Sequence, residues 1–206
     1  SPTPLSTILV KPDGKRALIN YKGNTQALTA DCIDFSDVNC KVALFDGHEP
    51  HLSLAWLQRQ RKHAPPSMLD AGSLHEGTRA LMQRVDYLVA SEKFARQYAG
   101  DAETALSQLA AHSPAVVITL GERGLIWQRG LEHGKLQAPP ITTIDTTGAG
   151  DAFHGAFAAA LTTDLSWQEI LRYASVAGAW CCSKKGARPG LPSREEHQTL
   201  LRHWCN

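Results

Sequence analysis

The chain has 206 residues, of which 43% are hydrophobic and 20% are charged, and its formal net charge at pH 7 is +1. This length supports one sizeable hydrophobic core, and the composition is that of a folded globular protein. Because Lys and Arg are scattered and almost balanced by Asp and Glu, the sequence argues against a nucleic acid or an anionic membrane as partner and favours a small molecule.

The first predicted element is a β-hairpin. Apolar runs at residues 7–10 and 17–21 flank a Lys-Pro-Asp-Gly segment at residues 11–14. Proline presets the backbone of such a turn and glycine allows a positive φ. The chain is therefore expected to open on two antiparallel strands.

The short apolar runs that follow are typical of buried strands, and helical periodicity fills the gaps between them. Strands are expected at residues 42–45, 67–69, 87–89 and 116–120. Helices are expected at residues 52–61, 75–84, 93–98 and 102–111. This alternation predicts an α/β fold in which a mainly parallel sheet is flanked by helices.

A second hairpin and a helical region complete the chain. The hairpin is expected at residues 124–128 and 135–138, around Gly130 and Gly134. From Gly148 onward the pattern is helical throughout.

Capping boxes mark the starts of two late helices. Ser166 is followed three residues later by Glu169, and Ser193 by Glu196. In such a box the hydroxyl and the carboxylate each accept a hydrogen bond from a backbone amide at the start of the helix. These helix boundaries are therefore predicted directly.

The run Asp-Thr-Thr-Gly-Ala-Gly-Asp-Ala-Phe at residues 145–153 carries the chemistry. Gly148 and Gly150 let backbone amides converge on one point, where the helix N-terminus adds partial positive charge. Asp151 in the first helical turn places a carboxylate beside this anion site. A carboxylate that takes a proton from a hydroxyl, next to a phosphate site, suits phosphoryl transfer.

Taken alone, such a loop is explained better by a turn followed by a capped helix than by a phosphate site. Two other phosphate motifs are excluded, because the loop lacks the third glycine of a dinucleotide-binding fold and the chain contains no Gly-x4-Gly-Lys-Ser/Thr. His154, three residues after Asp151, could be a second acid-base group, but packing inside the helix layer is the simpler interpretation.

The full run resembles the C-terminal signature of the ribokinase-like (PfkB-type) carbohydrate kinases, Asp-Thr-x-Gly-Ala-Gly-Asp-x-Phe, and residues 145–153 match it completely. Upstream, residues 119–124 (Thr-Leu-Gly-Glu-Arg-Gly) resemble the family's strand-end nucleotide loop. Downstream, residues 184–190 (Lys-Lys-Gly-Ala-Arg-Pro-Gly) resemble its nucleotide and monovalent-cation loop. Three motifs in the family's order outweigh the simpler interpretation of the loop.

The resemblance implies roles for individual residues. Asp151 would be the catalytic base, with the amides of Gly148, Ala149 and Gly150 as the anion hole for the transferring phosphate. The expected contacts with ATP are Thr119, Gly121, Gly124 and Ser91. The expected ligands of a K⁺ ion are Asp145, Thr147 and backbone oxygens of Cys181, Lys184 and Gly186. The expected substrate contacts are Asn24, Asp46 and Asp70, and Mg²⁺ would accompany ATP.

The chain departs from the family pattern at three positions. Gly190 stands where the family often has a serine that completes the cation site, which leaves K⁺ activation open. Ser91 and Phe94 replace the asparagine and the acidic residue of a Pro-Asn-x-x-Glu segment that helps to bind Mg²⁺. Ketohexokinase-like and sulfofructose kinase-like members look similar in having a serine near this point, which favours a ketose as substrate.

The resemblance also predicts the domain organisation. Residues 1–24 would form part of a β lid with a substrate-side hairpin, and residues 25–206 the α/β nucleotide-binding and catalytic domain. The N-terminal third of the family fold is expected to be absent from this chain. A homodimer formed through the lid strands is the expected assembly.

We therefore predict an ATP-dependent kinase that phosphorylates a hydroxyl of a small sugar, with a ketose or modified ketose favoured. The alternatives are a nucleoside kinase of the same fold and a catalytically silent nucleotide-binding regulatory protein. No apolar run approaches the roughly 18 residues of a membrane span, so the protein is expected to be cytoplasmic. The five cysteines fit neither redox nor zinc-ligand spacing and are expected to be reduced.

Overall fold

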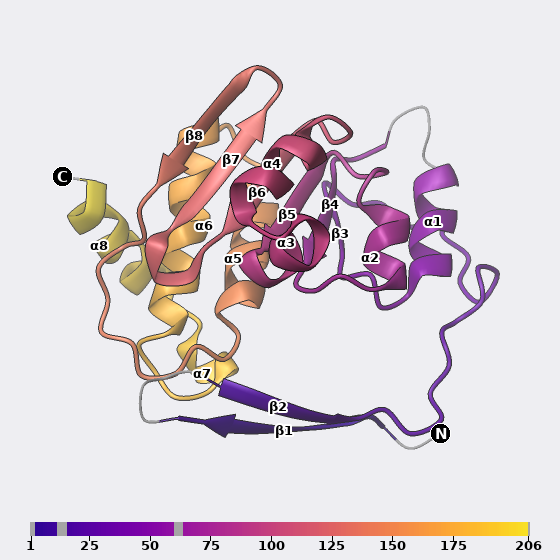
Figure 1. Ribbon diagram of the computed structural model, residues 1–206, viewed down its shortest axis with the longest axis horizontal. Helices are drawn as coiled ribbons and strands as arrows, with labels where there is room; N and C mark the ends of the chain where they lie inside the picture. The colour runs from indigo at the N-terminus through magenta and orange to yellow at the C-terminus, as the bar shows by residue number, and fades with distance from the viewer. Residues whose placement is uncertain (1–2, 12–15, 60–63, 206) are drawn as a thin grey trace. The chain divides into compact units, whose positions relative to one another are not determined.

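The computed structural model describes residues 3–11, 16–59 and 64–205 (Figure 1). The chain forms two compact units, which are described separately. One, here called the sheet unit, comprises Ala27–Ala138 and Ala158–Leu165. The other, here called the helical unit, comprises Ser1–Gln26, Pro139–Phe157 and Ser166–Asn206.

The sheet unit is built on a six-stranded sheet in the order β3-β4-β5-β6-β7-β8. The first four strands are parallel, whereas β7 and β8 are antiparallel to their neighbours. Their bounds are β3 (Ala43–Phe45), β4 (Ser67–Ala71), β5 (Tyr87–Ser91), β6 (Ala115–Thr119), β7 (Leu125–Arg129) and β8 (Glu132–Leu136). The prediction of a mainly parallel sheet in an α/β fold is confirmed.

The prediction for the last strand was wrong by three residues. The chain turns at Gly130, whose φ is +57°, so β8 begins at Glu132 rather than at residue 135. Gly134 lies inside β8, where a Cβ would approach the ring of Trp127 to 2.9 Å. This glycine makes room for an indole across the hairpin and is not part of the turn.

Four helices and one 3₁₀ turn belong to the sheet unit: α1 (Pro50–Arg59), α2 (Glu76–Leu81), α3 (Glu92–Ala99), α4 (Ala102–Ala110) and η1 (Gly121–Arg123). Figure 1 shows α3 and α4 in front of β5 and β6, and residues of these elements share one hydrophobic core. Leu88, Phe94 and Ile118 in this core are completely buried. The alternate strand residue Val89 is equally buried, so both faces of the sheet are covered, as its apolar runs predict.

The helical unit contains a separate two-stranded antiparallel sheet, β1 (Leu5–Val10) and β2 (Arg16–Tyr21). The predicted opening hairpin is confirmed in its strands, and residues 12–15 of its turn lie outside the described residues. The helices are α5 (Ala149–Ala160), α6 (Trp167–Cys181), α7 (Ala187–Gly190) and α8 (Arg194–Cys205). The last three residues of α5 belong to the sheet unit.

Both predicted capping boxes are present. At the start of α6, Ser166 N donates to Glu169 Oε2 at 2.8 Å and Glu169 N donates to Ser166 Oγ at 3.4 Å. At the start of α8 the corresponding distances for Ser193 and Glu196 are 2.7 and 3.2 Å. The amides at these helix starts are therefore satisfied locally.

The close approach of α5 to α6 depends on Gly178. A Cβ at this position would lie 3.1 Å from the carbonyl oxygen of Ala149 and 3.3 Å from Cβ of Phe153. The aromatic rings of Phe153, Phe157 and Trp167 follow one another at centroid distances of 6.1 and 5.8 Å. These contacts fix the helix that follows the glycine loop.

In the described part of the chain, no helix has the length and apolar character that crossing a membrane requires. No disulfide joins the cysteines whose side chains are described, which are Cys32, Cys40, Cys181 and Cys182. Of these, Cys181 is buried and Cys32 is exposed.

Candidate active site

Asp145 organises the turn that leads into α5. Its side chain is 2% exposed, and its Oδ1 accepts hydrogen bonds from the amide and the hydroxyl of Thr147 at 2.9 and 2.7 Å. Its Oδ2 accepts a hydrogen bond from the amide of Gly186 at 2.8 Å. A buried carboxylate is stable when donors surround it in this way. Asp145 therefore joins the glycine loop to the loop that follows α6.

Gly148 is required at its position for two reasons. Its φ is +80°, and a Cβ there would lie only 2.5 Å from Cβ of Ala187. Gly150 is exposed, and a Cβ there would meet nothing within 4 Å. The loop is thus packed on one side and open on the other, at the start of a helix whose first amides point out of the helix.

Asp151 is exposed in the first turn of α5, as predicted. It lines a cavity of about 950 Å³ that lies wholly within the helical unit. Gly148 and Ala152 line the same cavity, together with Arg188 from α7. A carboxylate, a helix N-terminus and open space therefore meet at one point.

His154 is 4% exposed, and its Nδ1 donates to the carbonyl oxygen of Gly150 at 2.6 Å. Its ring also lies edge-on to Phe153, with centroids 5.9 Å apart. The expectation that this histidine packs inside the helix layer agrees with its burial. The hydrogen bond of His154 constrains the carbonyl group of Gly150, the second glycine of the loop.

The predicted K⁺ ligands come from two segments that the structure brings together. The carbonyl of Cys182 accepts hydrogen bonds from the amides of Ile144 and Asp145 at 2.8 and 3.2 Å, beside the bond between Asp145 and Gly186. One carboxylate with hydroxyl and carbonyl oxygens is a donor set that suits a monovalent cation. Asp145, Thr147 and the backbone oxygens of Cys181, Lys184 and Gly186 therefore fit the expected ion in chemical type.

The departure at Gly190 has a steric cause. A Cβ on this residue would lie 2.6 Å from the carbonyl oxygen of Cys181 and 3.0 Å from its Sγ. A serine side chain therefore has no room here. Any cation in this chain would be held without the serine that the family often uses.

Four other predicted residues lie along the carboxyl edge of the parallel strands in the sheet unit. Ser91 at the end of β5 is in register with Thr119 at the end of β6. Asp46 directly follows β3, and Asp70 lies near the end of β4. In open α/β sheets, ligands bind at this edge.

Gly121 and Gly124 follow Thr119 in the loop that contains η1. Both have positive φ, +62° and +84°. A Cβ on Gly124 would lie 1.9 Å from the carbonyl oxygen of Leu136, so this end of the loop lies against β8. A Cβ on Gly121 would meet nothing within 4 Å, so backbone there is open to a ligand.

Ser91 is the N-cap of α3 and its hydroxyl is already engaged. It accepts a hydrogen bond from the amide of Phe94 at 3.0 Å and donates to the carbonyl of Gly72 at 2.8 Å. Phe94 is completely buried in the core. Residues 91–94 therefore do not fit Mg²⁺ as the family segment does, because the hydroxyl is occupied and the acid is replaced by a core residue.

Asn24 lies in the exposed turn after β2, where the amide of Thr25 donates to the carbonyl of Lys22 at 3.3 Å. It belongs to the helical unit, whereas Asp46 and Asp70 belong to the sheet unit. Contact of these three residues with a substrate stays a prediction.

Sequence reasoning missed two ion pairs that join separate elements next to the predicted loops. Arg123, in the loop after β6, pairs with Glu92 at 2.6 Å, and Glu92 also pairs with Arg96. Hydrogen bonding to Glu92, with its negative charge, raises the pKa of Arg123. Lys184 pairs with Glu196 at 2.9 Å. Neither spacing in the sequence signals a contact, because both pairs depend on how separate elements pack.

The cluster of His48, Glu49 and His51 is part of the surface of the sheet unit. Oε2 of Glu49 accepts a hydrogen bond from the amide of Leu28 at 2.7 Å, and His48 stacks on His75 with ring centroids 5.4 Å apart. Among the residues that the structure describes, no group of three or more His, Cys, Asp or Glu side chains could hold a metal ion.

Comparison with known proteins agrees with this geometry. The family model of the pfkB family carbohydrate kinases matches residues 1–194. The chain is 28% identical to the ribokinase of Lactococcus lactis, over 97% of this chain and 67% of that protein. It is 27% identical to a probable fructokinase-4 of Arabidopsis thaliana, over 97% of this chain and 64% of that protein.

Solved structures give the same result. The structure of Arabidopsis thaliana ribokinase complexed with ribose and ATP matches 98% of this chain, with a TM-score of 0.83 and 25% identity. That match covers 70% of the ribokinase chain, and this chain spans about two thirds of the length of the curated relatives named above. The fold and the complete signature at residues 145–153 thus lead to one conclusion: the chain belongs to the pfkB family of carbohydrate kinases.

Proposed function

We propose that the protein that contains this chain is an ATP-dependent sugar kinase. The observation that carries the proposal is Asp151, an exposed carboxylate in the first turn of a helix that begins at the packed glycine Gly148. A protein that only binds nucleotide needs the amides of this loop but has no use for a base beside them.

The proposed reaction uses these groups in a single in-line step. An acceptor hydroxyl attacks the γ-phosphorus of ATP, the bond from that phosphorus to the β,γ-bridging oxygen breaks, and ADP leaves. Asp151 orients the hydroxyl and accepts its proton. The amides of Gly148, Ala149 and Gly150 stabilise the charge on the transferring group.

The sheet unit is proposed to supply nucleotide contacts through Thr119, Gly121, Gly124 and Ser91. Mg²⁺ would neutralise charge on the phosphates of ATP. A K⁺ ion at Asp145 and Thr147, with the backbone oxygens of Cys181, Lys184 and Gly186, would add positive charge beside the anion hole. The direct hydrogen bonds of Asp145 to Thr147 and Gly186 hold the same segments together.

A ketose or modified ketose is the proposed acceptor, because probable fructokinases are among the relatives and Ser91 replaces the family asparagine. Asn24, Asp46 and Asp70 are proposed to contact it. A nucleoside acceptor is the alternative within the fold, because a nucleoside kinase of Burkholderia thailandensis shares the fold with a TM-score of 0.78 at 18% identity.

A catalytically silent nucleotide-binding protein is the alternative outside the enzymes. The burial of Phe94, at the position of the acidic residue in the family segment, is the observation that favours it. Retention of Asp151 beside the loop favours catalysis.

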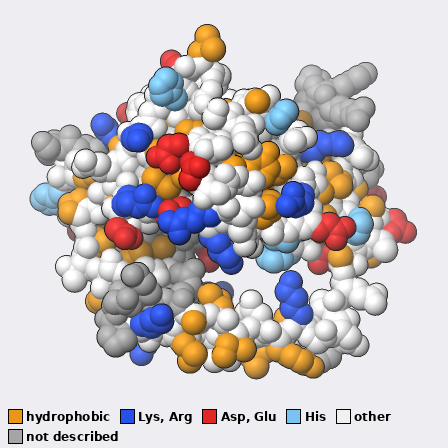
Figure 2. Space-filling view, in the orientation of Figure 1, with side chains coloured by type: hydrophobic (Ala, Val, Ile, Leu, Met, Phe, Trp, Pro, Cys, Tyr) orange, Lys and Arg blue, Asp and Glu red, His pale blue; other side chains and the backbone are white. Residues whose placement is uncertain are grey.

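The β1–β2 sheet is proposed to be part of a lid, formed within residues 1–24, that also joins two copies of the protein. Its large apolar side chains are exposed, among them Leu5 at 65%, Ile19 at 62% and Tyr21 at 65%. Figure 2 shows hydrophobic side chains in a row along this hairpin, at the bottom of the view. A two-stranded sheet is marginally stable in water without a partner for its apolar side chains.

A cytoplasmic location of the protein stays a prediction.

The test is ATP consumption by the full natural polypeptide across ketoses, aldoses, sulfonated sugars and nucleosides, with and without K⁺. Preferred turnover of a ketose supports the proposal in full, and preferred turnover of a nucleoside replaces the acceptor. Binding of ATP without turnover of any acceptor would establish the silent binding protein instead.

A further inference from the structure

The connection between α6 and α8, residues 182–193, includes the short helix α7 and is here called the loop after α6. It touches the proposed anion hole at two points. The amide of Gly186 donates to Oδ2 of Asp145 at 2.8 Å. Ala187 lies against Gly148, so closely that a Cβ on the glycine would be 2.5 Å from the alanine Cβ. A shift of this loop would therefore move the backbone of the glycine loop as well.

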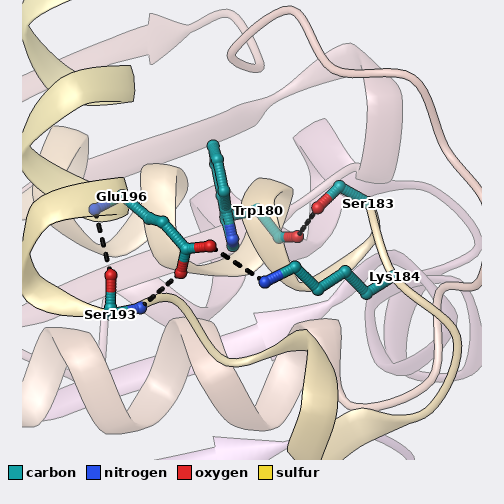
Figure 3. A network of polar contacts seen from close by, with 5 residues as sticks. All are labelled: Trp180, Ser183, Lys184, Ser193 and Glu196. Atoms are coloured by element: carbon teal, nitrogen blue, oxygen red, sulfur yellow. Dashed lines mark hydrogen bonds and ion pairs between the residues drawn. The ribbon is translucent and has the colours of Figure 1, made fainter.

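A network of three polar side chains closes the same loop on the side of α8 (Figure 3). Nζ of Lys184 donates to Oε1 of Glu196 at 2.9 Å, and Oε2 of Glu196 accepts from the amide of Ser193 at 2.7 Å. Oγ of Ser193 accepts from the amide of Glu196 at 3.2 Å. One carboxylate thus binds the beginning and the end of the loop together.

Trp180, near the end of α6, contacts two residues at the start of this loop. Oγ of Ser183 donates to the carbonyl of Trp180 at 2.7 Å, and Nζ of Lys184 lies 5.8 Å from the centroid of the Trp180 ring. The side chains of Lys184 and Glu196 are 42% and 34% exposed, so the pair is partly shielded from water. Partial burial reduces the screening of this ion pair by water, and the ring of Trp180 separately attracts the ammonium group of Lys184.

Two other features of the chain show that this arrangement exceeds ordinary helix capping. The box of Ser166 and Glu169 has the same hydrogen bonds between its own two members. The surface pair of Lys135 and Glu103 is longer, at 4.0 Å, and its side chains are 77% and 69% exposed. Glu196 combines a cap with a short ion pair across a loop.

We propose that Lys184 and Glu196 are positioning residues, whose ion pair holds the loop after α6 against the anion hole and thereby sets the geometry for phosphoryl transfer. The proposal rests on the proposed kinase function for its effect on turnover. The structural part of the proposal is that the ion pair keeps the loop closed. It does not depend on kinase activity and can be measured separately.

Cys181 provides that measurement. It is completely buried, with its Sγ 3.5 Å from the carbonyl oxygen of Thr147 and 3.7 Å from that of Ala187. Because the sulfur lies between Thr147 and Ala187, movement of the loop that carries Ala187 would expose it to a reagent. The rate at which iodoacetamide alkylates Cys181, distinguished from the adjacent Cys182 by fragmentation of the peptide in the mass spectrometer, therefore reports opening of the loop.

The experiment compares Lys184→Met and Glu196→Gln with the wild type in the full natural polypeptide. We expect alkylation of Cys181 to become about tenfold faster, and kcat to fall about tenfold, because small displacements at a reacting centre cost this much or more. Glu169→Gln, which alters a cap without a lysine, is the matched control and should change neither quantity. The double variant Lys184→Met/Glu196→Gln should change both quantities by less than the product of the two single effects, because either substitution alone already removes the ion pair.

Wild-type alkylation of Cys181 together with wild-type kcat in Lys184→Met and Glu196→Gln would overturn the proposal. Single effects that multiply in the double variant would also overturn it, because the two side chains would then act independently and not as a pair. If alkylation of Cys181 responds as expected but the wild type has no kinase activity, the proposed function is wrong. The proposal that the ion pair keeps the loop closed is then still supported.

Discussion

At the scale of single residues, backbone geometry explains the candidate site better than side-chain chemistry does. Position 148 requires glycine because of its positive φ and its contact with Ala187. Position 190 requires glycine because the carbonyl of Cys181 leaves no room for a side chain. Only Asp151 contributes a side chain with a proposed chemical role at the start of α5. Most of the site is therefore formed by loop backbone in a conformation and packing that only glycine allows.

The two constraints on Gly148 can be separated by substitution. Gly148→Ala introduces both an unfavourable φ and a clash at 2.5 Å, whereas Gly100→Ala, at φ +89°, introduces only the unfavourable φ because a Cβ there meets nothing within 4 Å. Strain of this kind costs about 1–3 kcal/mol. We expect Gly148→Ala to lower the free energy of unfolding more than Gly100→Ala, as measured by denaturant titration. Equal losses would show that Ala187 does not confine the loop.

At the scale of elements, local sequence signals determine where helices begin, and packing determines what they do. The capping boxes before α6 and α8 were predicted directly from Ser-x-x-Glu and are present. Hydrogen bonds from the hydroxyl and the amide of Ser166 lower the pKa of Glu169 from its ordinary value of 4.5. The cap should therefore respond to pH.

Because the pKa of Glu169 is lower in the folded chain, its stabilising effect is present above pH 4.5 and is lost as the pH falls through the folded-state value. We expect Glu169→Gln to lower the free energy of unfolding at neutral pH and to have no effect well below the folded-state pKa. Chemical denaturation across this range measures the difference. Glu76→Gln, at the start of α2, is the control, since no hydrogen bond to this carboxylate occurs among the described residues. A loss that persists unchanged at low pH would contradict the account of the cap.

The strands were predictable wherever a short apolar run is buried on both faces, as at β4, β5 and β6. The prediction failed at β8, because a glycine opposite a tryptophan is indistinguishable in sequence from a glycine in a turn. The loop motif predicted that Asp145 precedes the glycine loop and that Asp151 lies in the first turn of the helix that follows it. The contact of Asp145 with Gly186, 41 residues away, follows only from the packing of folded elements.

At the scale of the whole molecule, the exposed apolar side chains of the β1–β2 hairpin are the basis of the proposed dimer. We expect the full natural polypeptide to sediment as a dimer, and Ile19→Asp to convert it to a monomer, because the charge would enter an apolar contact. Leu131→Asp is the control, since Leu131 is 99% exposed at the turn between β7 and β8 and has no place in the proposed contact. A monomeric wild type, or a dimer that Ile19→Asp leaves intact, would contradict the assembly.

The proposed kinase chemistry depends most on Asp151 as the base, and one comparison of variants tests this role most directly. Turnover of the preferred sugar and affinity for ATP are measured together for the wild type, Asp151→Asn and Asp164→Asn, the last being an exposed aspartate just beyond the end of α5. We predict that kcat falls by about 10²–10⁴-fold in Asp151→Asn, with ATP affinity retained and Asp164→Asn unchanged. Wild-type turnover in Asp151→Asn would contradict the assignment and leave the glycine loop as a binding site alone.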